Sequence, residues 1–148
     1  MGSMSRAHGW LGCVVFLCGL AVVLTTSSPA AAQSAIVSLV LQDFSDCTNA
    51  NVNDDNKILT RGQVSVVRNT DNGTTAVKIG ITAKPDTTYH FFLKCVRLLG
   101  DIKTDDEGIG ETVFTFQTSS VGPVFAFDMY PEGAPAGNKY QSVQVHFQ

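Results

Sequence analysis

Hydrophobic and polar residues alternate through most of the chain after residue 33, a period typical of β-strands that have one face in a core and the other in water. The clearest case is residues 74–83. There Val77, Ile79 and Ile81 alternate with small or polar residues, so they are expected to point inward. Clusters of Gly, Asp, Asn and Pro separate the alternating segments, and helical periodicity is almost lacking. The expected strands are residues 35–42, 62–69, 74–83, 87–98, 112–118, 124–130 and 140–147.

The alternation also predicts which side chains of the other strands share the inward face. In residues 87–98, every second side chain from Tyr89 to Cys95 forms that face, whereas His90 and Lys94 lie on the opposite face, which is expected to meet solvent. The other residues expected to point inward are Val64, Val66, Phe114, Phe116, Phe125, Phe127, Met129, Val143, Val145 and Phe147.

Two turns are marked by their residues. Residues 70–73 end in Asn-Gly, which readily takes the positive φ values of a tight hairpin turn. Residues 105–108 end in Gly108 and predict a second hairpin turn with glycine at the positive-φ position. Residues 43–59 and 131–139 lack a strand pattern and are expected to be irregular.

The number of strands fixes the expected fold class. About seven strands within residues 33–148 predict a single all-β domain, an antiparallel two-sheet sandwich of the immunoglobulin-like type. A small closed barrel is the alternative.

The first 32 residues have the pattern of a secretory signal peptide. A weakly basic start at Arg6 is followed by an apolar run over residues 10–24 and by small residues that end in Ala-Ala-Ala at position 32. The run is shorter than the roughly 20 residues of a membrane anchor. Cys13 and Cys18 lie inside the run, not at its end where a lipid-modified cysteine is expected. We therefore expect a secreted or periplasmic protein with no stable membrane insertion after cleavage.

Two cysteines, Cys47 and Cys95, remain after the signal segment. In an oxidising compartment they are expected to form one intramolecular disulfide, although intermolecular pairing and free thiols stay open. Such a link is worth about 4 kcal/mol in the chain-entropy model. A zinc site is not favoured because the chain has no Cys-x-x-Cys.

The charge and the reactive residues point away from nucleic acid and from catalysis. The formal net charge is −3 at pH 7, so no basic nucleic-acid surface is expected. His90 and His146 are predicted on solvent-facing strand positions, and no Gly-x-Ser-x-Gly motif accompanies them. Asp128 and Glu132 are interpreted as surface charges, not as a glycosidase pair. No enzyme activity and no cofactor are expected.

Two groups of residues have the types that bind metal ions. His90, His146, Cys95 and Met129 supply the ligands of a blue-copper site, but His90 and Cys95 are predicted on opposite faces of one strand. A calcium site in residues 46–56 stays open. That segment is rich in Asn and Asp, whose side chains also satisfy their own backbone in loops, and it fails the EF-hand pattern.

A ligand surface is predicted around the irregular segment 131–139. Tyr130 and Tyr140 flank its Gly- and Pro-rich backbone, and tyrosines make good contact residues. Loops on rigid sandwiches often carry recognition. The other interpretation is a connection with a structural role only.

Three segments resemble a known class of domain. These are residues 62–67, residues 84–89 with the sequence Lys-Pro-Asp-Thr-Thr-Tyr, and residues 104–110 with the sequence Thr-Asp-Asp-Glu-Gly-Ile-Gly. They resemble the immunoglobulin-like and fibronectin-type β-sandwich modules of secreted bacterial proteins. The resemblance covers about half of residues 33–148, and such modules often have no known activity. The cysteine–tryptophan–cysteine core of a true immunoglobulin domain is missing, because the one tryptophan is Trp10.

The expected function is therefore that of an exported binding or structural module with a protein or glycan ligand. A carbohydrate- or cell-surface-binding module is the first alternative. A metal-dependent enzyme is the second.

Overall fold

The computed structural model describes residues 32–135 and 137–148. Residues 1–31 of the predicted signal segment, with Cys13 and Cys18, lie outside the described residues. The described elements are β1 (Gln33–Leu41), β2 (Thr60–Asn69), β3 (Thr74–Thr82), β4 (Thr88–Leu93), β5 (Arg97–Lys103), β6 (Ile109–Gln117), the 3-10 helix η1 (Thr118–Ser120), β7 (Val124–Phe125), β8 (Phe127–Tyr130), β9 (Tyr140–Ser142) and β10 (Val145–His146). Within these residues no helix is long and apolar enough to cross a membrane.

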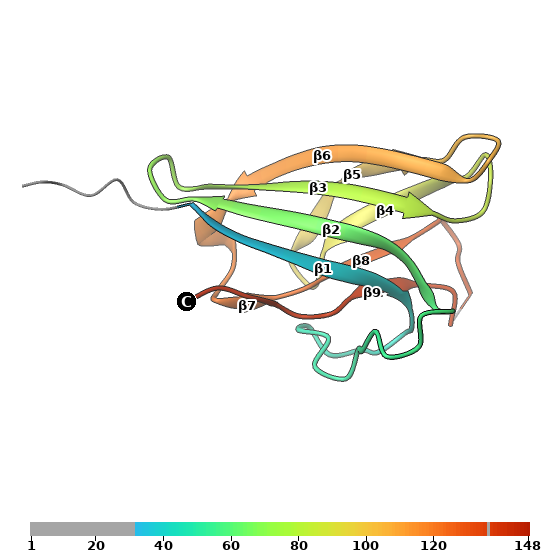
Figure 1. Ribbon diagram of the computed structural model, residues 1–148, viewed down its shortest axis with the longest axis horizontal. Helices are drawn as coiled ribbons and strands as arrows, with labels where there is room; N and C mark the ends of the chain where they lie inside the picture. The colour runs from blue at the N-terminus through green and yellow to red at the C-terminus, as the bar shows by residue number, and fades with distance from the viewer. Residues whose placement is uncertain (1–31, 136) are drawn as a thin grey trace, which may run out of the picture.

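Eight of the strands form one antiparallel sheet in the order β5-β4-β8-β9-β1-β2-β3-β6, and β7 pairs with β10 in a small second sheet. The large sheet bends over on itself, so that β1, β2, β3 and β6 lie in front of β4, β5 and β8 in Figure 1. The all-β antiparallel class is confirmed. The arrangement differs from the expected sandwich of two separate sheets, because the pairing of β9 with β1 joins both halves into one nearly closed sheet.

The two end strands, β5 and β6, meet at the seam where the sheet almost closes. An aromatic ring fills this seam. A Cβ atom at Gly100 of β5 would overlap the ring of Phe114 from β6, so the absence of a side chain makes room for the ring. The same ring stacks on Phe91 with a centroid distance of 6.0 Å. Side-chain packing therefore holds the seam, where the described strands form no ladder with each other.

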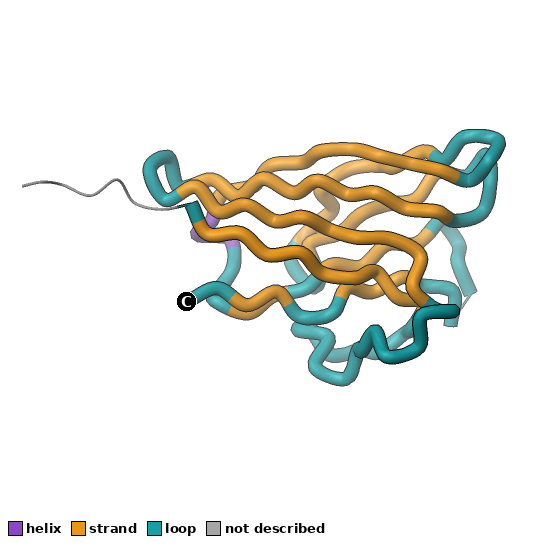
Figure 2. Tube along the Cα trace, in the orientation of Figure 1, coloured by secondary structure: helices purple, strands orange, loops and turns teal. Residues whose placement is uncertain are grey.

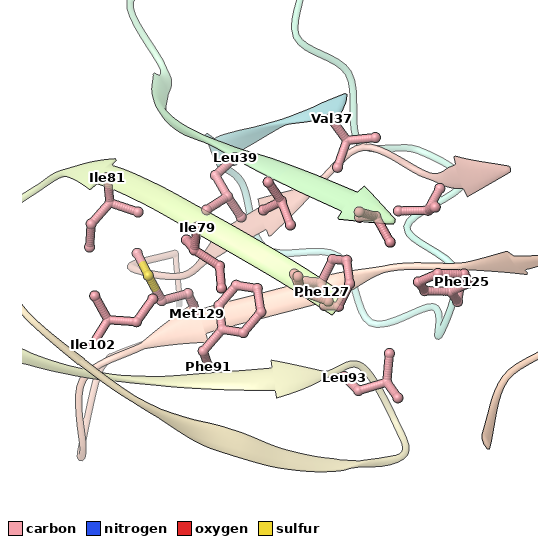
Figure 3. Close-up of a cluster of buried hydrophobic side chains, with 14 of the residues drawn as sticks. Val37, Leu39, Ile79, Ile81, Phe91, Leu93, Ile102, Phe125, Phe127 and Met129 are labelled. Carbon is pink, nitrogen blue, oxygen red and sulfur yellow. The ribbon is translucent and has the colours of Figure 1, made fainter. Parts of the chain in front are cut away.

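The core lies between the two halves of the bent sheet and contains the side chains that alternation predicts. Figure 3 shows Phe91 and Phe127 near its centre, and their rings stack with centroids 5.1 Å apart. Ile79 and Met129 are fully buried beside them. The inward positions of β2, β3, β4, β6 and β8 are thus confirmed, since period-two alternation reports the core face directly.

The expected strand over residues 87–98 is wrong in one respect, because it is two strands. β4 and β5 are joined by a tight turn in which the Val96 N–H donates to the Leu93 carbonyl over 2.9 Å. Cys95 takes a φ of 57° in this turn and is exposed, so it does not share the inward face. The turn contains no Gly, Pro, Asn or Asp, the residues that usually reveal a turn in a sequence.

Two further expected strands are interrupted where the chain changes sheet. Residues 124–130 form β7 in the small sheet and then β8 in the large sheet. Residues 140–147 form β9 and then β10 in the same way. The hydrophobic alternation continues across both changes, because both sheets cover the same core.

Both predicted turns are present. Residues 70–73 connect the paired residues Asn69 and Thr74, and Gly73 has a φ of 66°. In the second turn the Gly108 N–H donates to the Asp105 carbonyl over 3.1 Å, and Gly108 has a φ of 83°. The second turn connects the unpaired strands β5 and β6, whereas a regular hairpin would pair them.

Candidate functional site

The long loop between β1 and β2, residues 42–59, folds over the outer face of the large sheet. Figure 2 shows it as the long teal segment below the strands. Under it, Val40 of β1 pairs with Gln141 of β9, and Gln141 pairs with Asp128 of β8. All three are buried although they alternate with core residues, and Val52 of the loop is buried with them. The loop therefore supplies a second layer outside the sheet.

Polar contacts fasten this loop at several points. The Phe44 N–H donates to Gln141 Oε1 over 2.8 Å, and Gln141 Nε2 donates to the Phe44 carbonyl over 2.9 Å. The Ser38 hydroxyl donates to Asp54 Oδ2 over 2.7 Å. These bonds satisfy polar groups that the loop removes from water.

The predicted disulfide between Cys47 and Cys95 is present, with a Cα–Cα distance of 5.5 Å. It joins the loop to the turn between β4 and β5. Both cysteines are exposed, and the disulfide uses the Cys95 sulfur that a copper site would need.

Beside the disulfide, Lys94 extends under the loop into a buried polar cluster. We call Lys94, Asn49 and Asp128 the Lys94 cluster. Lys94 Nζ donates to Asn49 Oδ1 and, over 2.7 Å, to the Phe44 carbonyl. It lies 3.5 Å from Asp128 Oδ1. The Lys94 and Asp128 side chains are only 5% and 12% exposed, so the expectation that Lys94 meets solvent is wrong.

The amide of Asn49 is held rigidly in this cluster. Asn49 is completely buried and has a left-handed φ of 55°. Its Nδ2 donates to the Ser142 carbonyl over 2.9 Å and to the Phe127 carbonyl over 3.3 Å. These two acceptors direct the amide nitrogen to the sheet and the amide oxygen to Lys94.

The electrostatics of the Lys94 cluster are dominated by burial. Loss of water raises the pKa of the Asp128 carboxyl, and the positive charge of Lys94 opposes that rise without cancelling it. Asp128 Oδ1 is buried and lacks a hydrogen bond of good geometry, so its contact with Lys94 is a charge contact at 3.5 Å. Asp128 is therefore not the surface charge that its sequence context suggested.

The Asn- and Asp-rich residues of the loop point in different directions. Asp46 accepts hydrogen bonds from its own loop, including the Ala50 N–H at 2.8 Å, and this bond lowers its pKa. Asp54 accepts from Ser38. The oxygen of Asn49 is bonded to the ammonium group of Lys94. Within residues 32–135 and 137–148, no group of three or more His, Cys, Asp or Glu is placed to hold a metal ion.

The two tyrosines predicted to bind a ligand lie on opposite faces of the sheet. Tyr140 pairs with the buried Met129 and turns inward, where its ring meets Tyr89 edge-on at 5.9 Å. Burial raises the pKa of Tyr140. Tyr130, one position after Met129, points outward. The structure does not bring the two rings to one surface.

The outward ring of Tyr130 has two close neighbours. Phe92 stacks on it with a centroid distance of 4.8 Å and an interplanar angle of 14°. Lys139 Nζ lies 5.4 Å from the centroid. A sugar ring that stacks on an aromatic side chain needs a free ring face, and Phe92 already occupies one of the two faces here.

The two histidines lie in different sheets. His90 is on β4, and its Nδ1 contacts Asp101 Oδ1 at 2.7 Å. His146 is exposed on β10, which belongs to the small sheet. Met129, the fourth residue type of the copper set, is buried in the core.

A wide groove runs over β2, β3 and β6 on the half of the sheet that the loop leaves open. Most of its lining belongs to the outer face, and the inward residues Ile81 and Tyr140 also line it. Its volume is about 940 Å³. Gly80 forms its floor, because a Cβ there would meet only Glu111 Oε1, at 3.8 Å. We call it the Gly80 groove. Its lining is Ile36, Thr60, Arg61, Gly62, Gln63, Ser65, Lys78, Gly80, Ile81, Thr82, Ala83, Lys84, Ile109, Gly110, Glu111 and Tyr140.

Sequence reasoning missed both the groove and the Lys94 cluster. The groove had one signal, a glycine inside a regular strand pattern, which often marks a place where another group approaches the backbone. The Lys94 cluster had none, because its burial depends on a loop that is distant in sequence from Lys94 and Asp128.

Comparison with known proteins brings no relative to this chain: no protein-family model and no curated protein matches it. Its function is inferred from the geometry of the groove, the Lys94 cluster and the disulfide.

Proposed function

We propose that this chain is an exported, non-catalytic binding module whose ligand lies in the Gly80 groove. The observation that carries the proposal is an open hollow of about 940 Å³ on a rigid sheet, with a backbone floor and walls of polar and apolar side chains. Preformed concave sites of this kind are the usual places for ligands.

The register of the sheet explains the shape of the groove. Gly80 lies between Gln63 of β2 and Glu111 of β6, so two long polar side chains flank a position with no side chain. Ile36 and Ile109, which are 69% and 48% exposed, add apolar contacts. Such a surface suits an extended ligand that has both hydroxyl groups and apolar faces, as a glycan does.

The charged side chains that line the groove suggest that its ligand is negatively charged. Arg61, Lys78 and Lys84 line it together with one acidic residue, Glu111, although the whole chain has a net charge of −3. Lys78 Nζ contacts Glu111 Oε2 at 3.5 Å and both side chains are well exposed, so this pair is easily rearranged by a ligand. The ligand class we propose is an acidic cell-surface glycan.

Export is proposed on the disulfide and the signal-like N-terminal sequence together. Disulfides persist in oxidising compartments and are rare in the cytosol. The exposed position of Cys47 and Cys95 makes the link accessible to cytosolic reductants, so an oxidising location fits it better. Immunoglobulin-like modules of secreted proteins also fold in oxidising compartments. The antiparallel all-β class of this chain agrees with such a module in fold class and in nothing finer.

The direct test is a titration of uronic-acid and neutral oligosaccharides into the labelled protein, followed by amide shifts. We expect acidic sugars to shift the amides of β2, β3 and β6, and Gly80→Val to abolish the shifts. The added side chain points into open space at a backbone position that valine readily adopts, so the fold is kept.

Ala76→Val on the same outer face of β3 is the matched control, because Ala76 does not line the groove. It should leave the shifts intact. Binding that survives Gly80→Val but is lost in Tyr130→Ala would place the site on the other half of the sheet and refute the proposal.

A further inference from the structure

A primary amine, a carboxamide and a carboxyl group meet at one buried point in the Lys94 cluster. They come from three separate parts of the chain: Lys94 from the turn after β4, Asn49 from the loop over residues 42–59, and Asp128 from β8. Lys94 Nζ contacts the Asn49 side chain directly, and Asp128 Oδ1 is 3.5 Å from the same Nζ. No binding or structural role of the Gly80 groove requires these three groups.

The geometry points to a covalent bond between these residues: Lys94 Nζ and Asn49 Cγ join in an intramolecular isopeptide bond, and Asp128 carries the protons. This is a single self-modification of the folded chain. It is independent of the ligand proposed for the groove.

The reaction balances without an oxidant, a reductant or a second substrate. The Lys94 ammonium first gives a proton to the Asp128 carboxylate, which leaves a neutral amine. The Nζ electron pair then attacks Asn49 Cγ and forms the new C–N bond. Asp128 passes its proton to Nδ2 and takes one from Nζ. The Cγ–Nδ2 bond breaks, and Nδ2 leaves as ammonia.

Burial favours the neutral form of the Asp128 acid that this step needs. A separated ammonium and carboxylate lose their hydration under the loop, whereas a neutral amine and a carboxylic acid do not pay that cost. The raised pKa of Asp128 has the direction required of a group that accepts a proton from Lys94. The Asn49 side chain opposes the rise of the Asp128 pKa, so the carboxyl has the amide as well as the amine for a neighbour.

The surroundings hold the reacting groups in place. Two backbone carbonyls, of Ser142 and Phe127, fix the leaving nitrogen of Asn49, and the hydrogen bond to Lys94 holds the Asn49 carbonyl beside the attacking nitrogen. The disulfide joins Cys47 to Cys95, near neighbours in sequence of Asn49 and Lys94, and keeps the loop close to the turn. Holding the amine and the amide at contact distance has the same effect on the reaction rate as a very high concentration of a free amine.

The test is mass spectrometry of the full gene product, expressed with its own N-terminal segment, purified in folded form and reduced. We expect a proteolytic digest to contain one branched peptide that joins Asn49 to Lys94, with a mass about 17 Da below the sum of the two separate peptides. The branched peptide is decisive. The intact mass alone is not, because cyclisation of an N-terminal Gln33 also releases ammonia.

Two variants and one control separate chemistry from folding. Lys94→Arg keeps a positive charge but lacks the amine, and Asp128→Asn keeps the shape but lacks the proton carrier. In both variants, positions 49 and 94 should be found only in separate, unlinked peptides. Lys57→Arg, at an exposed lysine in the same loop, should retain the branched peptide.

Circular dichroism confirms that each purified protein is folded. A folded wild-type protein whose digest contains only the two unlinked peptides overturns the inference. So does a branched peptide that persists at full yield in Asp128→Asn, because Asp128 would then not carry the protons.

Discussion

Val40 and Gln141 face each other across β1 and β9 on the outer side of the sheet, and both are completely buried. Neighbouring outward residues of β1 such as Ile36, which is 69% exposed, meet solvent. The difference is the loop over residues 42–59, which covers one half of the sheet's outer face and leaves the other half open. The fold thus separates a covered half, fastened by the disulfide and the Lys94 cluster, from an open half with the Gly80 groove.

The first prediction concerns the hydrogen bonds that hold this cover. Gln141→Ala removes the acceptor of the Phe44 N–H and one of the two donors to the Phe44 carbonyl, which keeps its bond from Lys94. We expect the free energy of unfolding to fall by about 2 kcal/mol, the usual cost of unpaired buried polar groups. Urea denaturation measures it. Gln63→Ala, at an exposed position of β2, should change the free energy by less than about 0.5 kcal/mol.

The second prediction couples the disulfide to the proposed isopeptide bond. The two links close nearly the same loop, so each should mask the loss of the other. In the Asp128→Asn background, replacing Cys47 and Cys95 by alanine should lower the free energy of unfolding by about 4 kcal/mol, the chain-entropy value for a loop of this length. In the wild-type background the same replacement should cost clearly less.

Guanidinium denaturation of the four proteins gives the coupling energy. Equal costs of removing the disulfide in both backgrounds would show that a second link does not close the loop. The comparison is internal, so an overall destabilisation by Asp128→Asn does not disturb it.

Alternation predicted the core well because a side chain's face in a strand is a local property of the backbone. Val77, Ile79 and Phe127 needed no knowledge of their partners to be placed inward. The continuous connection between the two halves of the sheet was not predictable in the same way, since it depends on β1 pairing with β9, about a hundred residues further along the chain.

The candidate sites were less predictable for the same reason. Asp128 occupies an outward strand position and Lys94 lies in the turn after β4, two places where charged residues normally meet water, and only the distant loop reverses that. Tyr130 and Tyr140 both flank the segment expected to bind, but the register of β8 against β9 places them on opposite faces. A one-position difference in register would have reversed this, and sequence patterns do not fix register between strands.

The third prediction is that acid loosens the covering loop. Hydrogen bonds from the Gly137 N–H, the Ala50 N–H and the Ser38 hydroxyl lower the pKa values of Asp43, Asp46 and Asp54 in the fold. A lowered pKa stabilises the fold above the unfolded value of 3.8, and that stability is lost as the pH falls through the folded values.

The pKa of Asp128 is shifted in the opposite direction, upwards. Its raised pKa means that the folded state binds the proton more readily, so its contribution favours folding as the pH falls towards 3.8. Amide hydrogen exchange should therefore show faster opening of the loop below about pH 4 than at pH 6. In Asp46→Asn, the Ala50 amide should lose this acid dependence. Protection factors of the loop amides, which correct for the slower intrinsic exchange in acid, contradict the prediction if they are as high below about pH 4 as at pH 6.

The fourth prediction tests how the sheet is closed between β5 and β6. Gly100→Ala places a methyl group where the ring of Phe114 lies, and this ring also packs on Phe91 in the core. Because the ring has to move, we expect the free energy of unfolding to fall by about 1–3 kcal/mol.

Gly122→Ala is the control, since an added Cβ there has no atom within 4 Å. In a Phe114→Ala background, where the space is already empty, Gly100→Ala should cost less than in the wild type, because only the strain of an alanine at the Gly100 φ of 159° remains. A cost that is the same in both backgrounds would mean that the ring does not hold the seam, and thermal melts of the four proteins decide between these outcomes.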